Sequence, residues 1–347
     1  MSRLHDVPLS ALDLATVTTA TDTRTALQHT RELAQHVERL GFTRFWLAEH
    51  HNMPGVASSS PAILIGHVAD ATTTLRVGSG GVMLPNHPPL VVAEQFGTLS
   101  ALHPGRIDLG IGRAPGTDPR TAQALRRTTG PLSVDDFPQQ LSELNGYFDG
   151  TEQLTAMPAP GNKPDVFLLG SSGYSAQVAG LLGLPFAFAH HFSAENTLPA
   201  LALYRDRFRP SERLAEPYAV VCASVIVADT DEEALRLAGP GALAWVQLRN
   251  GRPAPVPTTQ EAADYPYNDL ERLIFEDRIA SQVIGSPKTV EAQLERLLED
   301  TLADELMVTT MVAEQADRLR SYELLADIAG RSTGRDSSER VKTEVEV

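Results

Sequence analysis

Hydrophobic positions along the chain form short uninterrupted runs that alternate with longer stretches of helical period. Eight short runs, rich in aliphatic side chains, are typical of buried strands. They are Leu9–Ala15, Arg44–Ala48, Leu75–Leu84, Arg106–Gly112, Asp165–Gly170, Pro185–His190, Tyr218–Ala228 and Glu305–Thr310. In the stretches between them, apolar residues recur every three or four positions, which predicts helices. These are Thr25–Leu40, Pro89–Leu102, Asp136–Leu144, Ser175–Leu182, Leu198–Phe208, Thr289–Glu299 and Ala313–Ile328.

Eight such strand and helix units in 347 residues predict an α/β fold, a TIM (β/α)8 barrel. An open doubly wound sheet is the alternative. The segment 239–286 is too long for an ordinary connection and contains NGRPAPVPTT, so we expect an insertion between the seventh and eighth strands that could close over the active site as a lid. The predicted organisation is a single barrel domain over residues 1–330, with the insertion at about 239–286. Residues 331–347 are polar and charged and are expected to form a flexible C-terminal tail.

The composition narrows the class of ligand. The formal charge of −15 disfavours a polyanionic partner, because nucleic acid or an anionic membrane surface requires a basic patch. Cys222 is the only cysteine, so an intrachain disulfide is excluded and nothing indicates an oxidising compartment. The start MSRLHDVPLS lacks a signal-peptide run, and no segment reaches the roughly 18 to 20 apolar residues of a membrane span. We therefore expect a cytoplasmic protein that binds a small molecule, with no nucleic-acid or membrane partner.

Polar side chains follow several of the predicted strands, where the active site of a TIM barrel is built. Glu49, His50 and His51 follow the second strand, GIGRAPG the fourth, GSSGYS the fifth, and His190 and His191 the sixth. Since adjacent side chains of a strand point to opposite faces, and neither H-E-x-x-H nor H-x-H occurs, we predict no metal site here. His190 and His191 are interpreted as rim residues.

Two of these clusters suit a phosphate group. In LGSSGYSAQVAG, small residues precede a helix whose first turn offers free backbone N–H groups, although Ser172 or Ser175 could serve only as a helix cap. Arg113 could bind a phosphate with its fork of donors or form a structural salt bridge at the rim. GIGRAPG is not a dinucleotide fingerprint, because its glycine spacing differs and Pro115 stands where the helix should run.

The glycines of VGSGGVML interrupt the third strand. Gly78, Gly80 and Gly81 indicate either a bulge where a ligand approaches the backbone closely or a sharp bend without a ligand. The local pattern leaves both readings open.

Three segments, taken in order, resemble the bacterial luciferase-like flavin-dependent monooxygenases of the non-luminescent branch. They are AEHHNMPG, VGSGGVMLPNHPPLVVAEQFGTLSALHPGRIDLGIGRAPG and LLGSSGYSAQVAGLLGLPFAFAHHF. The resemblance extends from Leu9 to about Ile328. It implies a TIM barrel, usually paired into a homodimer, with FMN at the C-terminal ends of the strands. Gly112 stands where luciferase has a reactive cysteine, and the loop after the second strand also differs, so light emission is not expected.

The resemblance also implies roles for individual residues. His50 would be the catalytic imidazole near the reactive edge of the flavin, and Glu49 would lie beside the flavin. Gly80 and Gly81 match an unusual non-proline cis peptide under the flavin ring. Arg113 matches the arginine that binds the FMN phosphate, and the cradle at the helix start would be completed by Ser171, Ser172 and Ser175.

The implied activity is that of a two-component monooxygenase. Reduced FMN would come from a separate flavin reductase as a co-substrate, and O2 would oxygenate an apolar organic substrate such as an aromatic polyketide or another secondary metabolite. The homodimer is expected to form through helices 61–71 and 89–102. Alternatives are an F420-dependent hydride-transfer oxidoreductase on the same barrel, a metal-dependent hydrolase using Glu49 and the histidines, and a flavin-binding protein without catalysis.

Overall fold

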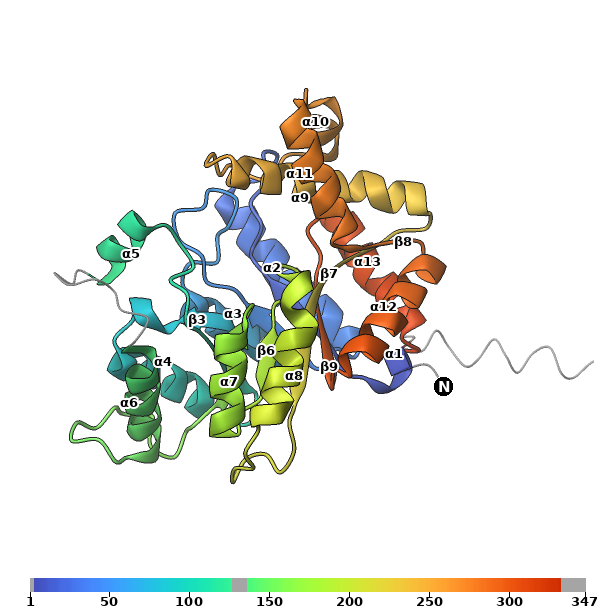
Figure 1. The fold of residues 1–347 in the computed structure, drawn as a ribbon. Coiled ribbons are helices and arrows are strands. Elements are labelled where there is room, and N and C mark those ends of the chain that lie inside the picture. Colours follow the sequence, from blue (N-terminus) through green and yellow to red (C-terminus); the bar gives the residue numbers. More distant parts are fainter. Residues whose placement is uncertain (1–2, 127–135, 332–347) are drawn as a thin grey trace, which may run out of the picture.

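Eight parallel strands close into a barrel in the computed structural model, which describes residues 3–126 and 136–331 (Figure 1). The ring runs β1, β2, β3, β4, β5, β6, β7 and β9, and pairing of β9 with β1 closes it. This confirms the predicted TIM barrel. The strands are β1 (Leu9–Asp13), β2 (Arg44–Leu47), β3 (Arg76–Met83), β4 (Ile107–Gly112), β5 (Asp165–Gly170), β6 (Phe186–Phe188), β7 (Ala219–Val227), β8 (Val283–Gly285) and β9 (Glu305–Thr309).

Helices surround the barrel, and the seven predicted from the sequence are all present with ends shifted by a few residues. Local chemistry fixes such ends: the Asp22 side chain accepts from the Thr25 backbone N–H at the start of α2, and Gly41 follows its end with φ +77°. The helices are α1 (Arg3–Asp6), α2 (Thr23–Arg39), α3 (Pro61–Ala71), η1 (Leu84–Asn86), α4 (Pro89–Leu102), α5 (Pro119–Arg126), α6 (Phe137–Asp149), α7 (Gly173–Leu182), η3 (Ala194–Asn196), α8 (Thr197–Arg207), α9 (Asp231–Arg249), α10 (Thr259–Asp264), α11 (Asp269–Ala280), α12 (Pro287–Thr301) and α13 (Gln315–Ile328). Within the described ranges, none of these helices is both long and apolar enough to cross a bilayer.

The N-terminal end of the barrel is closed by a buried ion-pair network. Arg44 donates to Asp108 at 2.9 Å and to Glu305 at 3.0 Å, and the Trp46 Nε1–H donates to Asp108 at 3.0 Å. Above this layer the interior is filled by apolar side chains, including Trp46, Phe167 and Met307. Because charge and bulk occupy the N-terminal end, a ligand can enter only at the C-terminal ends of the strands.

The segment 239–286 is mostly helical and lies over one end of the barrel, at the top of Figure 1. Its expected start at Gly239 falls inside α9, which continues to Arg249 despite Pro240, and α10 and α11 follow. The segment ends in β8, which pairs with Val225–Val227 of β7 outside the ring. The strand β8 was not predicted, because its apolar run consists only of Val283 and Ile284, between Gln282 and Gly285, and is too short to give a strand pattern. Of the expected tail, residues 332–347 lie outside the described residues.

Candidate active site

A cavity of about 420 Å³ opens at the C-terminal ends of the barrel strands. Seven of the eight residues predicted as site residues line it: His50, Gly80, Gly81, Arg113, Ser171, Ser172 and Ser175. They come from the ends of four different strands. The structure therefore brings together residues as far apart in the sequence as His50 and Ser175, because the strands of a barrel converge at its C-terminal end.

Glu49 is the exception. Its side chain is fully buried and does not line this cavity, but borders a smaller one with Ser59, Ser60 and His87. The alternation of side chains at the end of β2 explains the separation, because His50 points to one side while Glu49 and His51 point to the other.

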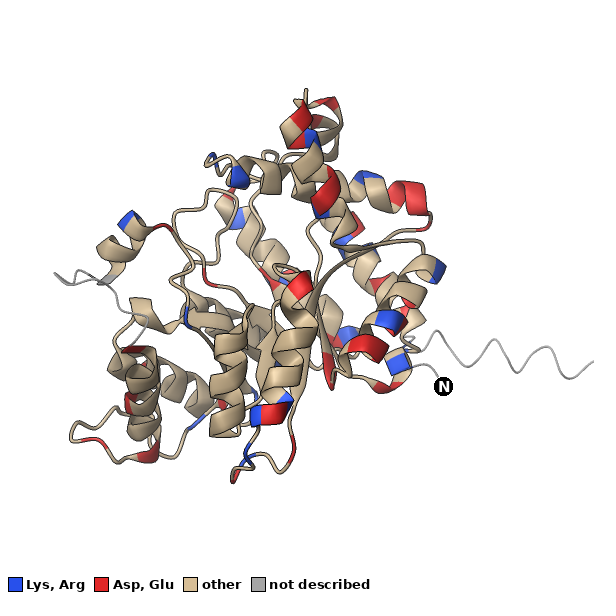
Figure 2. Ribbon diagram, in the orientation of Figure 1, with Lys and Arg blue, Asp and Glu red and all other residues tan. Residues whose placement is uncertain are grey.

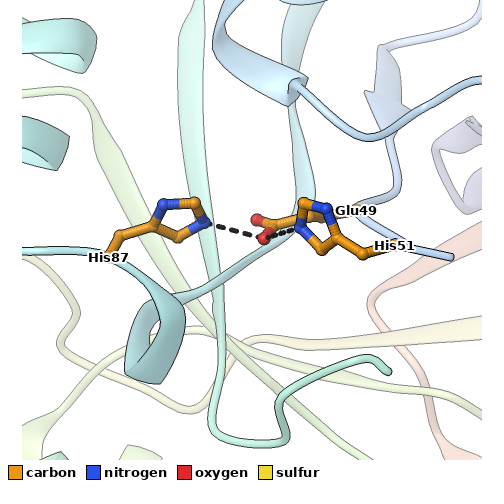
Figure 3. Close-up of side chains that lie close together, drawn as sticks. All are labelled: Glu49, His51 and His87. Atoms are coloured by element: carbon orange, nitrogen blue, oxygen red, sulfur yellow. Dashed lines mark hydrogen bonds and ion pairs between the residues drawn. The ribbon is translucent and has the colours of Figure 1, made fainter. Parts of the chain in front are cut away.

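The Glu49 carboxylate joins two loops (Figure 3). Its Oε1 accepts hydrogen bonds from His51 Nε2 at 2.8 Å and from His87 Nε2 at 2.7 Å, and its Oε2 accepts from the Met83 backbone N–H at 3.0 Å. Burial opposes ionisation, but the hydrogen bonds from His87 and His51 lower the pKa of Glu49 overall. The cluster thus holds the loop carrying His50 against the end of β3. The sequence analysis missed His87, whose signal was its place just after the third predicted strand.

Glu49, His51 and His87 are also the described group of side chains that could hold a metal ion, since their ligand atoms lie within 4.8 Å of one another. We expect metal analysis of the purified protein to find no stoichiometric zinc or iron. Both imidazoles already donate to one carboxylate oxygen, so a metal would have to replace two charge-assisted hydrogen bonds. One equivalent of bound metal that disappears in His87→Ala would contradict this prediction.

His50 is held as a neutral imidazole facing the cavity. Its backbone N–H donates to Ser58 O at 3.0 Å, and its Nδ1 lies 3.3 Å from Gly116 O. Burial lowers the pKa of His50, outweighing the contact with Gly116 that raises it. A neutral ring facing a carbonyl carries its proton on Nδ1, so Nε2 is the basic nitrogen.

The glycine pair of β3 forms one wall. The Gly80–Gly81 peptide bond is cis, as the resemblance implied, and the pairing of β3 with β4 shifts register between Gly80 and Val82. A Cβ on Gly80 would lie 2.6 Å from the Leu12 side chain, and one on Gly81 would lie 2.7 Å from Gly110 O. Packing by itself therefore requires glycine at both positions. The lack of side chains there leaves the backbone exposed to the cavity.

Arg113 and the start of α7 form a polar corner of the cavity. The Arg113 guanidinium lies 4.0 Å from the Tyr174 ring centroid, and no ion pair with a carboxylate is found for it in the described ranges. Ser172 is the N-cap of α7, but its side chain makes no capping hydrogen bond. The structural alternatives of a rim salt bridge and a Ser172 cap are therefore not observed. A cation, hydroxyl groups and a helix N-terminus together suit an anion.

His191 also lines the cavity, whereas His190 does not. His191 Nδ1 contacts Cys222 O at 3.0 Å, and burial lowers the pKa of its ring to about 4, so the ring is neutral. Of the two histidines interpreted as rim residues, His191 is therefore the one that faces the cavity. His190 contacts the Thr197 hydroxyl at 2.8 Å instead.

The sequence matches the family model for luciferase-like monooxygenases over residues 8–305. The chain belongs to the luciferase-like monooxygenase family. It is 45% identical over 325 residues to a luciferase-like monooxygenase of Escherichia coli K12, covering 93% of this chain and 97% of that relative. It is 34% identical over 329 residues to the N-acetyl-S-alkylcysteine monooxygenase of Bacillus subtilis, covering 92% and 98% of the two chains.

Among solved structures of the luciferase-like monooxygenase fold, apo-MsnO8 is 37% identical and superposes with a TM-score of 0.86, covering 95% of this chain and 99% of that one. More distant barrels of the same fold include a Baeyer–Villiger monooxygenase in complex with FMN, at 19% identity, and an F420-dependent alcohol dehydrogenase, at 13%. Those two barrels share the fold with this chain, and their names record FMN and F420 as their own cofactors. Membership of the luciferase-like monooxygenase family makes the chain an enzyme of the monooxygenase type that acts on a small molecule.

Proposed function

We propose that the protein is a two-component monooxygenase that uses reduced FMN, supplied by a separate flavin reductase, and O2 to oxygenate an apolar organic substrate, such as an aromatic polyketide or another secondary metabolite. The observation that carries the proposal is that the cavity has a polar, cationic corner and a largely apolar remainder. One corner combines Arg113 with the serine-rich start of α7, while much of the remaining wall is apolar and contains the neutral His50.

The residues present fit FMN. Arg113, Ser171, Ser172 and Ser175 would hold the phosphate, because a dianion is matched by a guanidinium and free helical N–H groups. Gly80 and Gly81 would lie against the ring system, since a surface without side chains accepts a flat ligand at close range.

Bound FMN in its reduced form supplies the electrons that activate O2. The protein positions the cofactor and the substrate, excludes water from the cavity and provides a side chain that accepts a proton. His50 Nε2 can accept a proton and return it, because burial keeps the ring neutral at physiological pH. Leu12, Trp46 and Met307 exclude water from the barrel side of the cavity. Trp245 and Leu248 of α9 line it from the segment 239–286, which we infer acts as the lid.

Cofactor choice is tested by supplying each candidate in turn. Reduced FMN generated by a flavin reductase and NADH is expected to bind more tightly than oxidised FMN, since the enzyme must accept one form and release the other. It is also expected to be consumed with O2. Anaerobic titration monitored by flavin absorbance measures both affinities without requiring a substrate. Tight binding of reduced F420, with no preference for reduced FMN, would favour the hydride-transfer alternative.

We also propose a homodimer through α3 and α4. Ile63 is 73% exposed on α3 and Leu102 is 68% exposed on α4, while the strongly charged helices α9 to α13 lie elsewhere (Figure 2). Light scattering is expected to give twice the chain mass of 37.5 kDa. The double variant Ile63→Asp/Leu102→Asp should become monomeric, because it places charge in the interface. Leu270→Asp, at a 64% exposed leucine of α11, is the control and should remain dimeric. A monomeric wild type refutes the dimer.

A further inference from the structure

The cavity contains a second cation that the proposed flavin site does not use. Arg113 and Arg278 are among the described residues that line it, and no aspartate or glutamate is. Such a cavity is electropositive inside a protein whose formal charge is −15. If Arg113 binds the phosphate of the cofactor, Arg278 still faces the cavity without a negative partner.

Arg278 lies on α11, in the segment that covers the barrel mouth. Although α11 also carries four acidic residues, no ion pair with Arg278 is found in the described part of the chain, and burial without an opposing carboxylate lowers its pKa. An arginine remains protonated even when it is partly buried, so the Arg278 guanidinium carries its positive charge where water solvates it only in part. Placing a cation there costs free energy unless an anion or several acceptors offset it.

The hydrogen bonds of Arg278 offset only part of that cost. Its Nη1 donates to His191 O at 2.7 Å, whereas its Nε is buried and lacks an acceptor. The guanidinium lies 4.8 Å from the centroid of the Trp245 ring, so the ring face holds it in place. A guanidinium has five N–H donors in a fixed fork, which leaves capacity for an oxyanion presented from the cavity.

The Trp245 ring beside this guanidinium belongs to a cluster of aromatic side chains. Phe192 lies 6.1 Å from Trp245 between ring centroids, and His191 lies 4.6 Å from Phe192. Phe192 is 51% exposed although it is a large apolar side chain. This corner therefore offers a flat apolar surface next to a guanidinium whose Nη2 makes no hydrogen bond in the described part of the chain.

We propose that Arg278 is a substrate-binding residue, and that the substrate is an organic anion whose carboxylate or similar oxyanion binds Arg278 while its apolar part packs against Trp245 and Phe192. This rests on the proposed function, because it assumes that the other cation, Arg113, is occupied by the cofactor. The expected substrate is then amphipathic, with an anionic group and an apolar part, rather than wholly apolar.

The test compares 2-naphthoate with 2-naphthamide, which have the same shape and differ in charge. Binding is measured by calorimetry with FMN at saturating concentration, so that the site at Arg113 is filled. Wild type is expected to bind the carboxylate about tenfold more tightly or better, as a charge-assisted hydrogen bond provides. Arg278→Gln should weaken naphthoate binding to the level of the amide and leave amide binding unchanged.

Two further variants separate this role from a structural one. Arg272→Gln removes an exposed arginine from the same helix and should keep the preference for the carboxylate. Arg278→Lys keeps the charge but not the fork, and should retain part of the preference. If Arg278→Gln does not fold, the wild-type preference and its reduction in Arg278→Lys still decide the proposal.

Three results would overturn it. The first is that wild type binds the two probes with equal affinity, or binds neither. The second is that Arg278→Gln weakens the binding of both probes equally. The third is that Arg278→Gln loses FMN affinity while probe binding is unaffected, which would assign Arg278 to the cofactor. The binding assay needs no turnover. Failure of reduced-FMN consumption therefore refutes the proposed function separately, and loss of the carboxylate preference with intact FMN consumption refutes only this inference.

Discussion

Replacing His50 with alanine is expected to reduce product formation by about 10²- to 10⁴-fold, the usual contribution of a positioned acid–base group. Affinity for reduced FMN should change little, because the hydrogen bonds of His50 are to Gly116 and Ser58 and not to Arg113 or α7, which we assign to the phosphate. Release of H2O2 should increase, since reduced flavin still reacts with O2 but the proton transfer is no longer guided. Product and H2O2 are measured in the same reductase-coupled reaction.

His190→Ala is the matched control, because His190 also follows a barrel strand, β6, but does not line the cavity. It should retain the wild-type ratio of product to H2O2. The pH profile adds a second readout. Burial lowers the pKa of His50 below 6.5, so the base is present above that lowered pKa and is lost as the pH falls through it. The acid limb of kcat/KM should therefore lie below pH 6.5 in wild type and disappear in His50→Ala. Loss of flavin binding in His50→Ala would show that its role is wrongly assigned.

Replacing Arg113 with alanine is expected to weaken FMN binding by about 1.5 to 3 kcal/mol, the contribution of a hydrogen bond to a charged group. The described ranges provide no carboxylate partner for Arg113, so the variant leaves no opposing charge unpaired and the loss reports on the ligand. Product formation should recover when reduced FMN is supplied in excess, which separates this variant from His50→Ala. Flavin affinity is measured by anaerobic titration.

Arg120→Ala, at an exposed arginine of α5, is the control for the change in net charge. It should leave flavin affinity unchanged. Arg113→Lys should fall between wild type and Arg113→Ala, because a lysine keeps the charge but cannot present two parallel donors. If Arg113→Ala and Arg120→Ala have equally small effects, the phosphate site is not at Arg113.

The strands and helices of the barrel could be predicted because their signals are local. A buried strand such as Ala219–Val227 is apolar at every position except Ser224, and a helix such as Thr23–Arg39 repeats its apolar residues at 3.6-residue spacing. The ends of the insertion could not be predicted in this way. The expected start at Gly239 lies inside α9, which continues through Pro240 to Arg249. Tertiary packing around the buried Leu237 and Leu243 offsets the cost of the proline.

The sequence by itself determined which residues could gather at the C-terminal ends of the strands, because strand order and side-chain alternation already place His50, Arg113 and the serines of the fifth strand end there. Only the tertiary structure decided their partners. The contact of Glu49 with His87 joins positions 38 residues apart, and that of Arg278 with His191 joins positions 87 apart. The absence of a carboxylate beside Arg113 and Arg278 within the described ranges is likewise a property of the folded cavity. Such pairings depend on which loops meet in space, and local periodicity carries no information about that.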